Sequence, residues 1–196
     1  MSEKQLLIDA VFINSGGGVS LLSYLIKHLE NSNNNNITYL LDNRIKKKIS
    51  FIPKRNKVFY IKGSILNRHY FYLKKHKSFD KVFCFANIPP SIRLDCEVFT
   101  YFHQVLFLNS GLDNGKIDFV IKIIKSAIIK ILRKNTDYWI VQTEYMQQLI
   151  AKNYDIKIEK IKIFPFYNIP IIDKENIGHR IKNQFVYVGL AHGKYK

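Results

Sequence analysis

Apolar runs of strand length alternate along the chain with segments whose apolar residues have a helical spacing. The first run, QLLIDAVFI at residues 5–13, is followed by a glycine-rich loop. Residues 19–29 come next, and their apolar side chains share one helical face: Leu21, Leu22, Leu25, Ile26 and Leu29. Short continuous apolar runs are typical of strands buried on both faces of a parallel sheet. This order of elements predicts the opening of a doubly wound α/β domain.

The same alternation continues to residue 165. Further strands are predicted at residues 37–41, 57–61, 81–86, 97–102, 137–141 and 160–164. Helices are predicted at residues 65–76, 117–132 and 144–152, and a loop at 111–115. We therefore expect an α/β domain with a doubly wound, Rossmann-like parallel sheet over residues 1–165. A linker is expected at 166–183, and the run FVYVG within 184–196 is expected to begin a second, truncated domain.

Composition and cysteine usage exclude several classes of protein. Cys84 and Cys96 are the only cysteines and no CxxC spacing exists, so neither a disulfide framework nor a metal site is expected. No apolar run reaches 18 residues, which argues against a spanning helix. The first residues lack the basic and apolar regions of a secretory signal. A cytoplasmic protein with reduced cysteines is expected.

The formal charge of +16 is concentrated in one stretch of the chain. Residues 44–81 contain 13 Lys/Arg and one acid, Asp80, which gives a local charge of +12. Such a stretch indicates an anionic partner, namely phospholipid headgroups, a phosphorylated acceptor or nucleic acid, unless it is only a solvated basic surface.

The predicted helix at 117–132 has a broad apolar face opposite lysines. This face comprises Ile117, Val120, Ile121, Ile124, Ala127, Ile128, Ile131 and Leu132. The pattern fits either a helix packed on the core or a helix that lies on an anionic membrane surface.

The loop Asn14-Ser15-Gly16-Gly17-Gly18 joins the first strand to the first helix. Glycines allow close backbone approach, and a helix N-terminus offers N–H groups and a positive dipole end to an anion. Leu21 stands where the GxGxxG fingerprint needs its last glycine, and no Gly-Lys-Ser/Thr ending is present. Asp42 follows the second strand, as a ribose-binding acid would, so a dehydrogenase stays open. The plain alternative is a tight turn without a ligand.

Three further segments follow predicted strands, at the edge where ligands bind in open α/β sheets. FANIPP contains Asn87 and Pro89, YFHQ contains His103 and Gln104, and QTEYM contains Thr143 and Glu144. His103 is a candidate general base or hydrogen-bond donor, and Thr143 is a candidate N-cap. The plain alternatives are a rigid proline loop, an ordinary histidine and a helix cap.

Taken in order, these motifs resemble a known family. A glycine-rich first loop, FANIPP, YFHQ, DYWIVQTEYM, KIKIFPF and FVYVG resemble family-4-type glycosyltransferases of the GT-B fold, found in bacterial surface-polysaccharide synthesis. The resemblance covers nearly the whole chain. It implies retaining transfer of a sugar from a nucleotide-sugar donor to a polysaccharide or lipid-linked acceptor, without a required metal or other cofactor.

The resemblance also implies roles for individual residues. Gly16, Gly17 and Gly18 would lie near the donor phosphates and the acceptor. His103 would line the acceptor site as the catalytic candidate, and the Thr143–Glu144 turn would face the cleft. Asn87, Pro89 and Gln104 complete the expected binding residues, since they also lie at the carboxyl ends of predicted strands.

The family's second domain binds the nucleotide, and here only FVYVG corresponds to it. The resemblance therefore implies an acceptor-side half that is inactive alone: a truncated gene product, one partner of a split enzyme whose donor domain is on another chain, or a pseudoenzyme. Two other classes stay open. A basic nucleic-acid-binding protein explains the charge but not the edge motifs, and no nucleic-acid module is visible. A non-catalytic subunit could instead recruit a partner to the inner membrane face.

Overall fold

The structure is a computed structural model that describes residues 5–32, 36–49, 55–105 and 116–165, with side chains from residue 123 onward in the last range. The chain divides into two units, Met1–Phe166 and Tyr167–Lys196. The predicted linker, the start of a second domain and the loop at 111–115 all lie outside the described residues.

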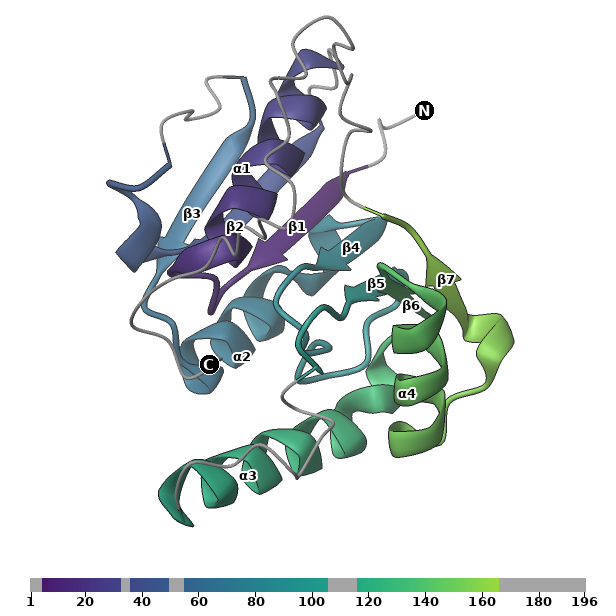
Figure 1. The fold of residues 1–196 in the computed structure, drawn as a ribbon. Helices are drawn as coiled ribbons and strands as arrows, with labels where there is room; N and C mark the ends of the chain where they lie inside the picture. Colours follow the sequence, from purple (N-terminus) through teal and green to yellow (C-terminus); the bar gives the residue numbers. More distant parts are fainter. Residues whose placement is uncertain (1–4, 33–35, 50–54, 106–115, 166–196) are drawn as a thin grey trace, which may run out of the picture. The chain divides into compact units, whose positions relative to one another are not determined.

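Seven strands of the first unit form one sheet (Figure 1). They are β1 (Leu6–Ala10), β2 (Ile37–Asp42), β3 (Lys57–Ile61), β4 (Lys81–Cys84), β5 (Glu97–Tyr101), β6 (Tyr138–Val141) and β7 (Ile161–Ile163). Every pairing is parallel, and the strand order is β3-β2-β1-β4-β5-β6-β7. This confirms the predicted doubly wound parallel α/β sheet.

Between the strands, α-helices and short 3₁₀ segments are found in the part of the chain that the structure describes. The helices are α1 (Gly16–Asn31), α2 (Ile65–Lys75), α3 (Lys116–Leu132) and α4 (Glu144–Tyr154). The 3₁₀ segments are η1 (Asn43–Ile45), η2 (His76–Ser78), η4 (Arg133–Asn135) and η5 (Ile158–Lys160). Each predicted strand and helix up to residue 165 therefore has a counterpart in the structure.

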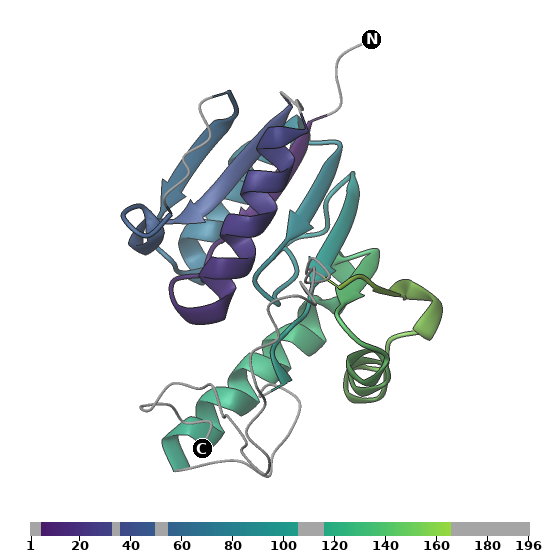
Figure 2. The ribbon, with the colours of Figure 1, turned by 45° about the horizontal axis from the view of Figure 1, so that its top comes forward.

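The two faces of the sheet are covered by different helices (Figures 1 and 2). Helix α1 buries Leu22, Leu25 and Ile26 against one face. Helix α2 packs Tyr72 on the other face, in a cluster that includes Cys84. Trp139 lies in the same row across the sheet as Cys84, and it packs with buried residues of α3 and α4. Helices α2, α3 and α4 therefore share one face, and α1 covers the other.

Two boundaries near the glycine loop differ from the prediction. The strand predicted over 5–13 ends at Ala10, because the chain turns at Val11 and Phe12, and Phe12 has a φ of 87°. Helix α1 begins at Gly16 and not at residue 19, so the glycines form its first turn. Apolar periodicity did not locate this turn, because glycine has no side chain to bury.

Helix α3 leaves most of its described apolar side chains in solvent. From residue 123 to 132 its buried residue is Ile129, whereas Ile123, Ile124 and Ile131 are 51%, 53% and 73% exposed. Core packing thus accounts for Ile129 and not for Ile124 and Ile131, which belong to the predicted apolar face. In the part of the chain that the structure describes, no helix is long and apolar enough to cross a membrane.

Candidate active site at the carboxyl edge of the sheet

The predicted site residues lie at the carboxyl ends of four strands. The glycine loop follows β1, Asn87 and Pro89 follow β4, His103 follows β5 and Thr143 follows β6. Because all strands are parallel and β1, β4, β5 and β6 are neighbours in that order, these segments share one edge. Strands lie about 4.8 Å apart, so the loop after β1 and His103 are separated by two strand spacings, about 10 Å.

The amino end of α1 differs from those of α2 and α4. Ser64 caps α2 and Thr143 caps α4 through side-chain hydrogen bonds, whereas the Ser15 side chain makes no cap bond and the first turn of α1 contains no acid. No side chain among the described residues caps the start of α1, so its first N–H groups and its positive dipole end can receive an anion. The Nζ of Lys48 donates to the carbonyl oxygen of Asn14 at 2.6 Å, which places a cation beside this loop.

The glycines leave space around this helix end. Gly16 has a φ of +59°, a conformation that favours glycine. A Cβ at Gly16 or Gly17 would meet nothing within 4 Å, and one at Gly18 would lie 3.4 Å from Ile13 Cδ1. The geometry therefore suits an anion such as a phosphate group.

Asn87 is committed to the protein's own backbone. It is buried with a φ of 64°, and its Oδ1 accepts the His103 N–H at 2.8 Å. Its own N–H donates to the Tyr101 carbonyl at 3.1 Å. Asn87 therefore ties the loop after β4 to the end of β5 and positions His103, and the ligand contact expected of it from the sequence stays a prediction.

The His103 ring is packed against aromatic side chains. Its centroid lies 5.1 Å from that of Tyr101 and 6.3 Å from that of Phe85. Nδ1 is buried and has no hydrogen-bond partner among the described residues. Burial lowers the pKa of His103 to about 4. The ring is therefore neutral near pH 7 and a weak base, which favours a hydrogen-bonding role over general-base catalysis.

The remaining predicted residues have simpler surroundings. Thr143 is exposed, and its Oγ1 accepts the Met146 N–H at 3.3 Å, which confirms the predicted N-cap. Glu144 is exposed in the first turn of α4, and Gln104 is half-buried beside His103 in the chain. Across the described residues, no group of His, Cys, Asp or Glu could hold a metal ion.

Arg68 is a residue of this edge that the sequence analysis did not identify. It lies buried on α2 and donates from Nε to Asp9 Oδ2 at 2.7 Å. It also donates to the carbonyl oxygens of Pro89 and Ile88, at 2.7 Å and 2.9 Å. One guanidinium thus joins α2, β1 and the FANIPP loop. The missed signal was Asp9, because an acid inside an apolar strand run requires a buried partner.

Tyr72 and Cys84 complete this buried cluster. The Tyr72 hydroxyl donates to Asp9 Oδ2 at 2.5 Å, and Arg68 Nη2 donates to Cys84 Sγ at 3.3 Å. Burial lowers the pKa of Arg68, but the attraction of the Asp9 carboxylate outweighs it and the net pKa is raised. Burial raises the pKa of the Cys84 thiol to about 12, so this cysteine is not a reactive thiolate.

Asp42 does not support the dehydrogenase alternative. It is buried at the end of β2, and Arg44 donates to it from Nε at 2.9 Å, from Nη2 at 2.6 Å and from its backbone N–H at 3.0 Å. Burial raises the pKa of Asp42, but these Arg44 contacts outweigh burial and lower it overall. The Asp42 side chain has no exposed surface, and both of its oxygens already accept hydrogen bonds from Arg44, so it presents no open carboxylate to ribose hydroxyls.

Comparisons with known proteins assign no family to this chain. No protein-family model matches the sequence. No curated protein matches it. Among solved structures, the chain is similar to the lipopolysaccharide outer core galactosyltransferase WaaB in its apo form, with 20% sequence identity and a TM-score of 0.47. The match covers 82% of this chain and 45% of that chain, so this chain spans less than half of that protein.

Proposed function

We propose that the described domain is the acceptor-side half of a GT-B glycosyltransferase of the family-4 type. The enzyme would transfer a sugar from a nucleotide-sugar donor to a polysaccharide or lipid-linked acceptor. The observation that carries this proposal is the shared edge, where Lys48 follows β2, the uncapped start of α1 follows β1 and His103 follows β5, all at the carboxyl ends of one parallel sheet. The order of the sequence motifs supports the same proposal.

The chemistry of this edge suits a phosphate-bearing donor and a hydroxyl acceptor. The N–H groups at Gly16–Gly18 and the Lys48 ammonium would bind donor phosphate oxygens, since helix dipole and cation both favour negative charge. The neutral His103 ring would hydrogen-bond an acceptor hydroxyl. Gln104 and the Thr143–Glu144 turn would line the rest of the acceptor site.

The nucleotide part of the donor would bind to a second domain, on the same chain or on a partner chain. Full sugar transfer therefore requires both halves, and the isolated acceptor-side domain should show neither transfer nor donor hydrolysis. Binding of a phosphate ligand to the isolated domain can still be measured, and this measurement directly tests the proposed phosphate site.

The open space at Gly17 allows a matched pair of variants. Gly17→Asp places a carboxylate in the first turn of α1, where the dipole stabilises it, and Gly17→Asn has nearly the same shape without the charge. We expect pyrophosphate to shift the amide resonances of residues 16–18 in the natural protein and in Gly17→Asn, but not in Gly17→Asp. Equal responses in all three proteins would contradict a phosphate site here.

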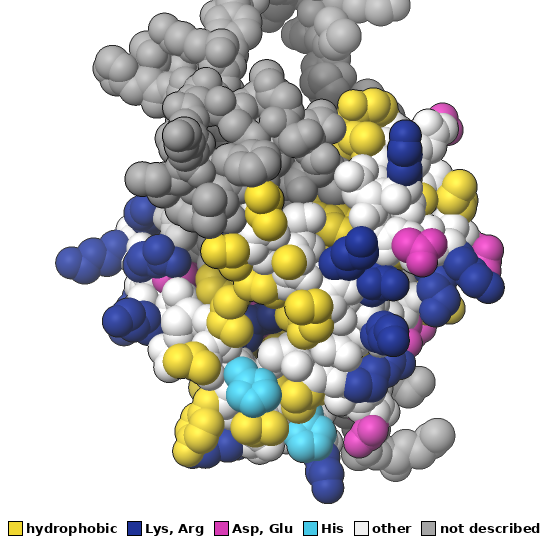
Figure 3. Space-filling view, turned by 90° about the horizontal axis from the view of Figure 1, so that it is seen from below, with side chains coloured by type: hydrophobic (Ala, Val, Ile, Leu, Met, Phe, Trp, Pro, Cys, Tyr) yellow, Lys and Arg dark blue, Asp and Glu magenta, His cyan; other side chains and the backbone are white. Residues whose placement is uncertain are grey.

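We further propose that the protein lies peripherally on the inner, anionic membrane face. Exposed apolar side chains occur on α3, at Ile124 and Ile131, and on α2, at Leu66, Tyr70 and Leu73. Seen from below the view of Figure 1, apolar side chains run across the molecule with Lys and Arg on both sides of them (Figure 3). Apolar insertion and lysine attraction act together at an anionic interface.

Vesicle sedimentation tests this second proposal. The protein should sediment with phosphatidylglycerol vesicles and not with neutral ones, and added salt should release it. The double variant Ile124→Ser and Ile131→Ser should weaken this binding. Binding to duplex DNA without binding to vesicles would favour a nucleic-acid-binding protein and overturn the membrane proposal.

A further inference from the structure

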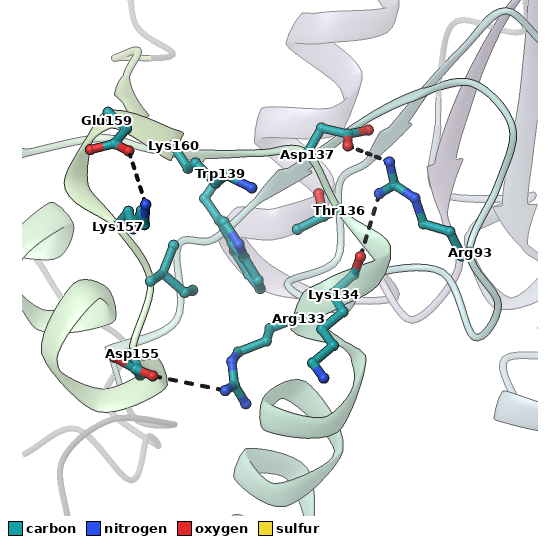
Figure 4. A pocket seen from close by; sticks show the side chains of 11 residues that line it. Arg93, Arg133, Lys134, Thr136, Asp137, Trp139, Asp155, Lys157, Glu159 and Lys160 are labelled. Atoms are coloured by element: carbon teal, nitrogen blue, oxygen red, sulfur yellow. Dashed lines mark hydrogen bonds and ion pairs between the residues drawn. The ribbon is translucent and has the colours of Figure 1, made fainter.

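A cavity of about 440 Å³ lies at the opposite edge of the sheet (Figure 4). Asp137 and Lys160 line it, and they directly precede β6 and β7, so the cavity is at the amino ends of these strands. Arg133 and Asp155, the residues that directly follow α3 and α4, also line it. This site is therefore separate from the candidate active site at the carboxyl ends.

Acidic side chains in the lining each face a cation of the lining. Arg93 Nη2 donates to Asp137 at 2.5 Å, and Lys157 Nζ lies 3.9 Å from Glu159. Asp155 faces Arg133 at 4.0 Å, the outer limit of an ion pair. The three acids are thus balanced by three of the five lining cations.

Two lining cations remain without an ion-pair partner among the described residues. They are Lys134 and Lys160, both exposed. Arg133 donates from Nη1 to the Lys130 carbonyl at 2.8 Å, and its Nη2 lies 4.0 Å from Asp155, beyond hydrogen-bond distance, so this guanidinium can still donate to a ligand. Figure 4 shows Arg133 and Lys134 on one side of the Trp139 ring and Lys160 on the other. The net charge of the lining is +2, which favours an anionic ligand.

The cavity is larger than an inorganic anion requires, and it falls in the size range of sites for small organic molecules. Ile156 supplies apolar surface in the lining, whereas the Trp139 side chain is 1% exposed and belongs to the core beneath the cavity. We propose that this cavity binds a small phosphomonoester, with its phosphate on Arg133 and Lys134 and its organic part extending over Ile156 toward Lys160. A sugar phosphate and a nucleoside monophosphate share this chemistry.

Trp139 makes the site directly measurable, because it is the single tryptophan of the chain. Its fluorescence should change saturably as a hexose phosphate or adenosine monophosphate is added, and calorimetry should give the same dissociation constant. The ester that binds with the lower dissociation constant shows whether the ligand is a sugar phosphate or a nucleoside monophosphate. Unphosphorylated hexose should not bind, and inorganic phosphate should bind more weakly than the esters.

Two double variants with the same charge change separate a site from a basic surface. Lys134→Gln with Lys160→Gln should weaken ester binding at least about tenfold, since two charge-assisted contacts are lost. Lys75→Gln with Lys152→Gln removes two exposed lysines that do not line the cavity, and it should leave the affinity unchanged. The proposal is overturned by no saturable response in either measurement, by equal affinities in both variants, or by inorganic phosphate that binds as tightly as the esters.

Discussion

Arg68 and Arg93 each pair with an aspartate, but they do so at opposite edges of the sheet and in different surroundings. The Arg68–Asp9 side chains are 5% and 0% exposed, at a distance of 2.7 Å. The Arg93–Asp137 side chains are 50% and 27% exposed, at 2.5 Å. The two pairs have similar distances, but the loss of one partner should cost different amounts of folding free energy. A buried charge is left without a counter-charge, whereas at the surface water replaces the lost partner.

This difference extends to the two edges as a whole. At the carboxyl edge, the polar side chains form hydrogen bonds within the protein. Those of Arg68, Asp9 and Asn87 fix the position of the Asn87–Pro90 loop. At the amino edge, Lys134 and Lys160 are exposed around a cavity. Internal contacts preorganise the first edge, while the second keeps cations available to a ligand.

The largest effect should come from the buried ion pair. Arg68→Met leaves Asp9 buried without a cation, and we expect a loss of about 3–5 kcal/mol in the free energy of unfolding. Arg93→Met, the matched variant at the amino edge, should cost no more than about 1 kcal/mol. Urea denaturation of both variants measures this, and equal losses would show that the two pairs do not differ as described.

The next effect concerns His103, whose folded pKa of about 4 lies below its ordinary value of 6.5. Between these pH values the unfolded chain binds a proton that the folded chain does not. This group should therefore lower the stability as the pH falls from 6.5 to 4, by up to about 3 kcal/mol. His103→Phe keeps an aromatic ring and should remove this part of the pH dependence. An NMR titration that gives His103 an ordinary pKa would refute the assignment.

Two glycines at the carboxyl edge differ in the space that surrounds them, and their alanine variants test this difference. A Cβ at Gly63 would lie 2.1 Å from Asp42 Oδ2 and 2.5 Å from Arg44 Nη2. Gly63→Ala must displace this ion pair, and we expect a cost of about 1–3 kcal/mol. Gly17→Ala enters open space and should change the stability by less than about 0.5 kcal/mol. Thermal denaturation compares the two, and a reversed order would contradict the contacts at Gly63.

The smallest effect should separate the two helix ends at this edge. Thr143→Ala removes the hydrogen bond to the Met146 N–H and should cost about 1 kcal/mol. Ser15→Ala removes no side-chain cap and should be close to neutral. If Ser15→Ala were as costly in a denaturant titration, α1 would be capped in solution, and its role as an open anion site would be lost.

Much of the fold was predictable because it depends on local patterns. The strand at 57–61 was predicted at its observed bounds, and the helix at 65–76 within one residue, since burial repeats with the period of each element. The parallel strands then placed the glycine loop, His103 and Thr143 at one edge. The sequence also predicted the Thr143 cap, because N-capping depends on neighbours within one turn.

The sequence determined which segments are strands and helices and which loops follow the strands, because these features repeat over short distances. Only the tertiary structure decided how the charged groups are used. It placed Arg68 of the basic stretch in the core beside Asp9, 59 residues away. It also paired the buried Asp42 with Arg44, whereas the sequence had left Asp42 open as a ribose-binding acid. It also assembled the amino-edge cavity from the ends of separate elements. Charge composition records how many cations are present, but solvation and pairing depend on contacts between residues distant in the chain, and these exist only after folding.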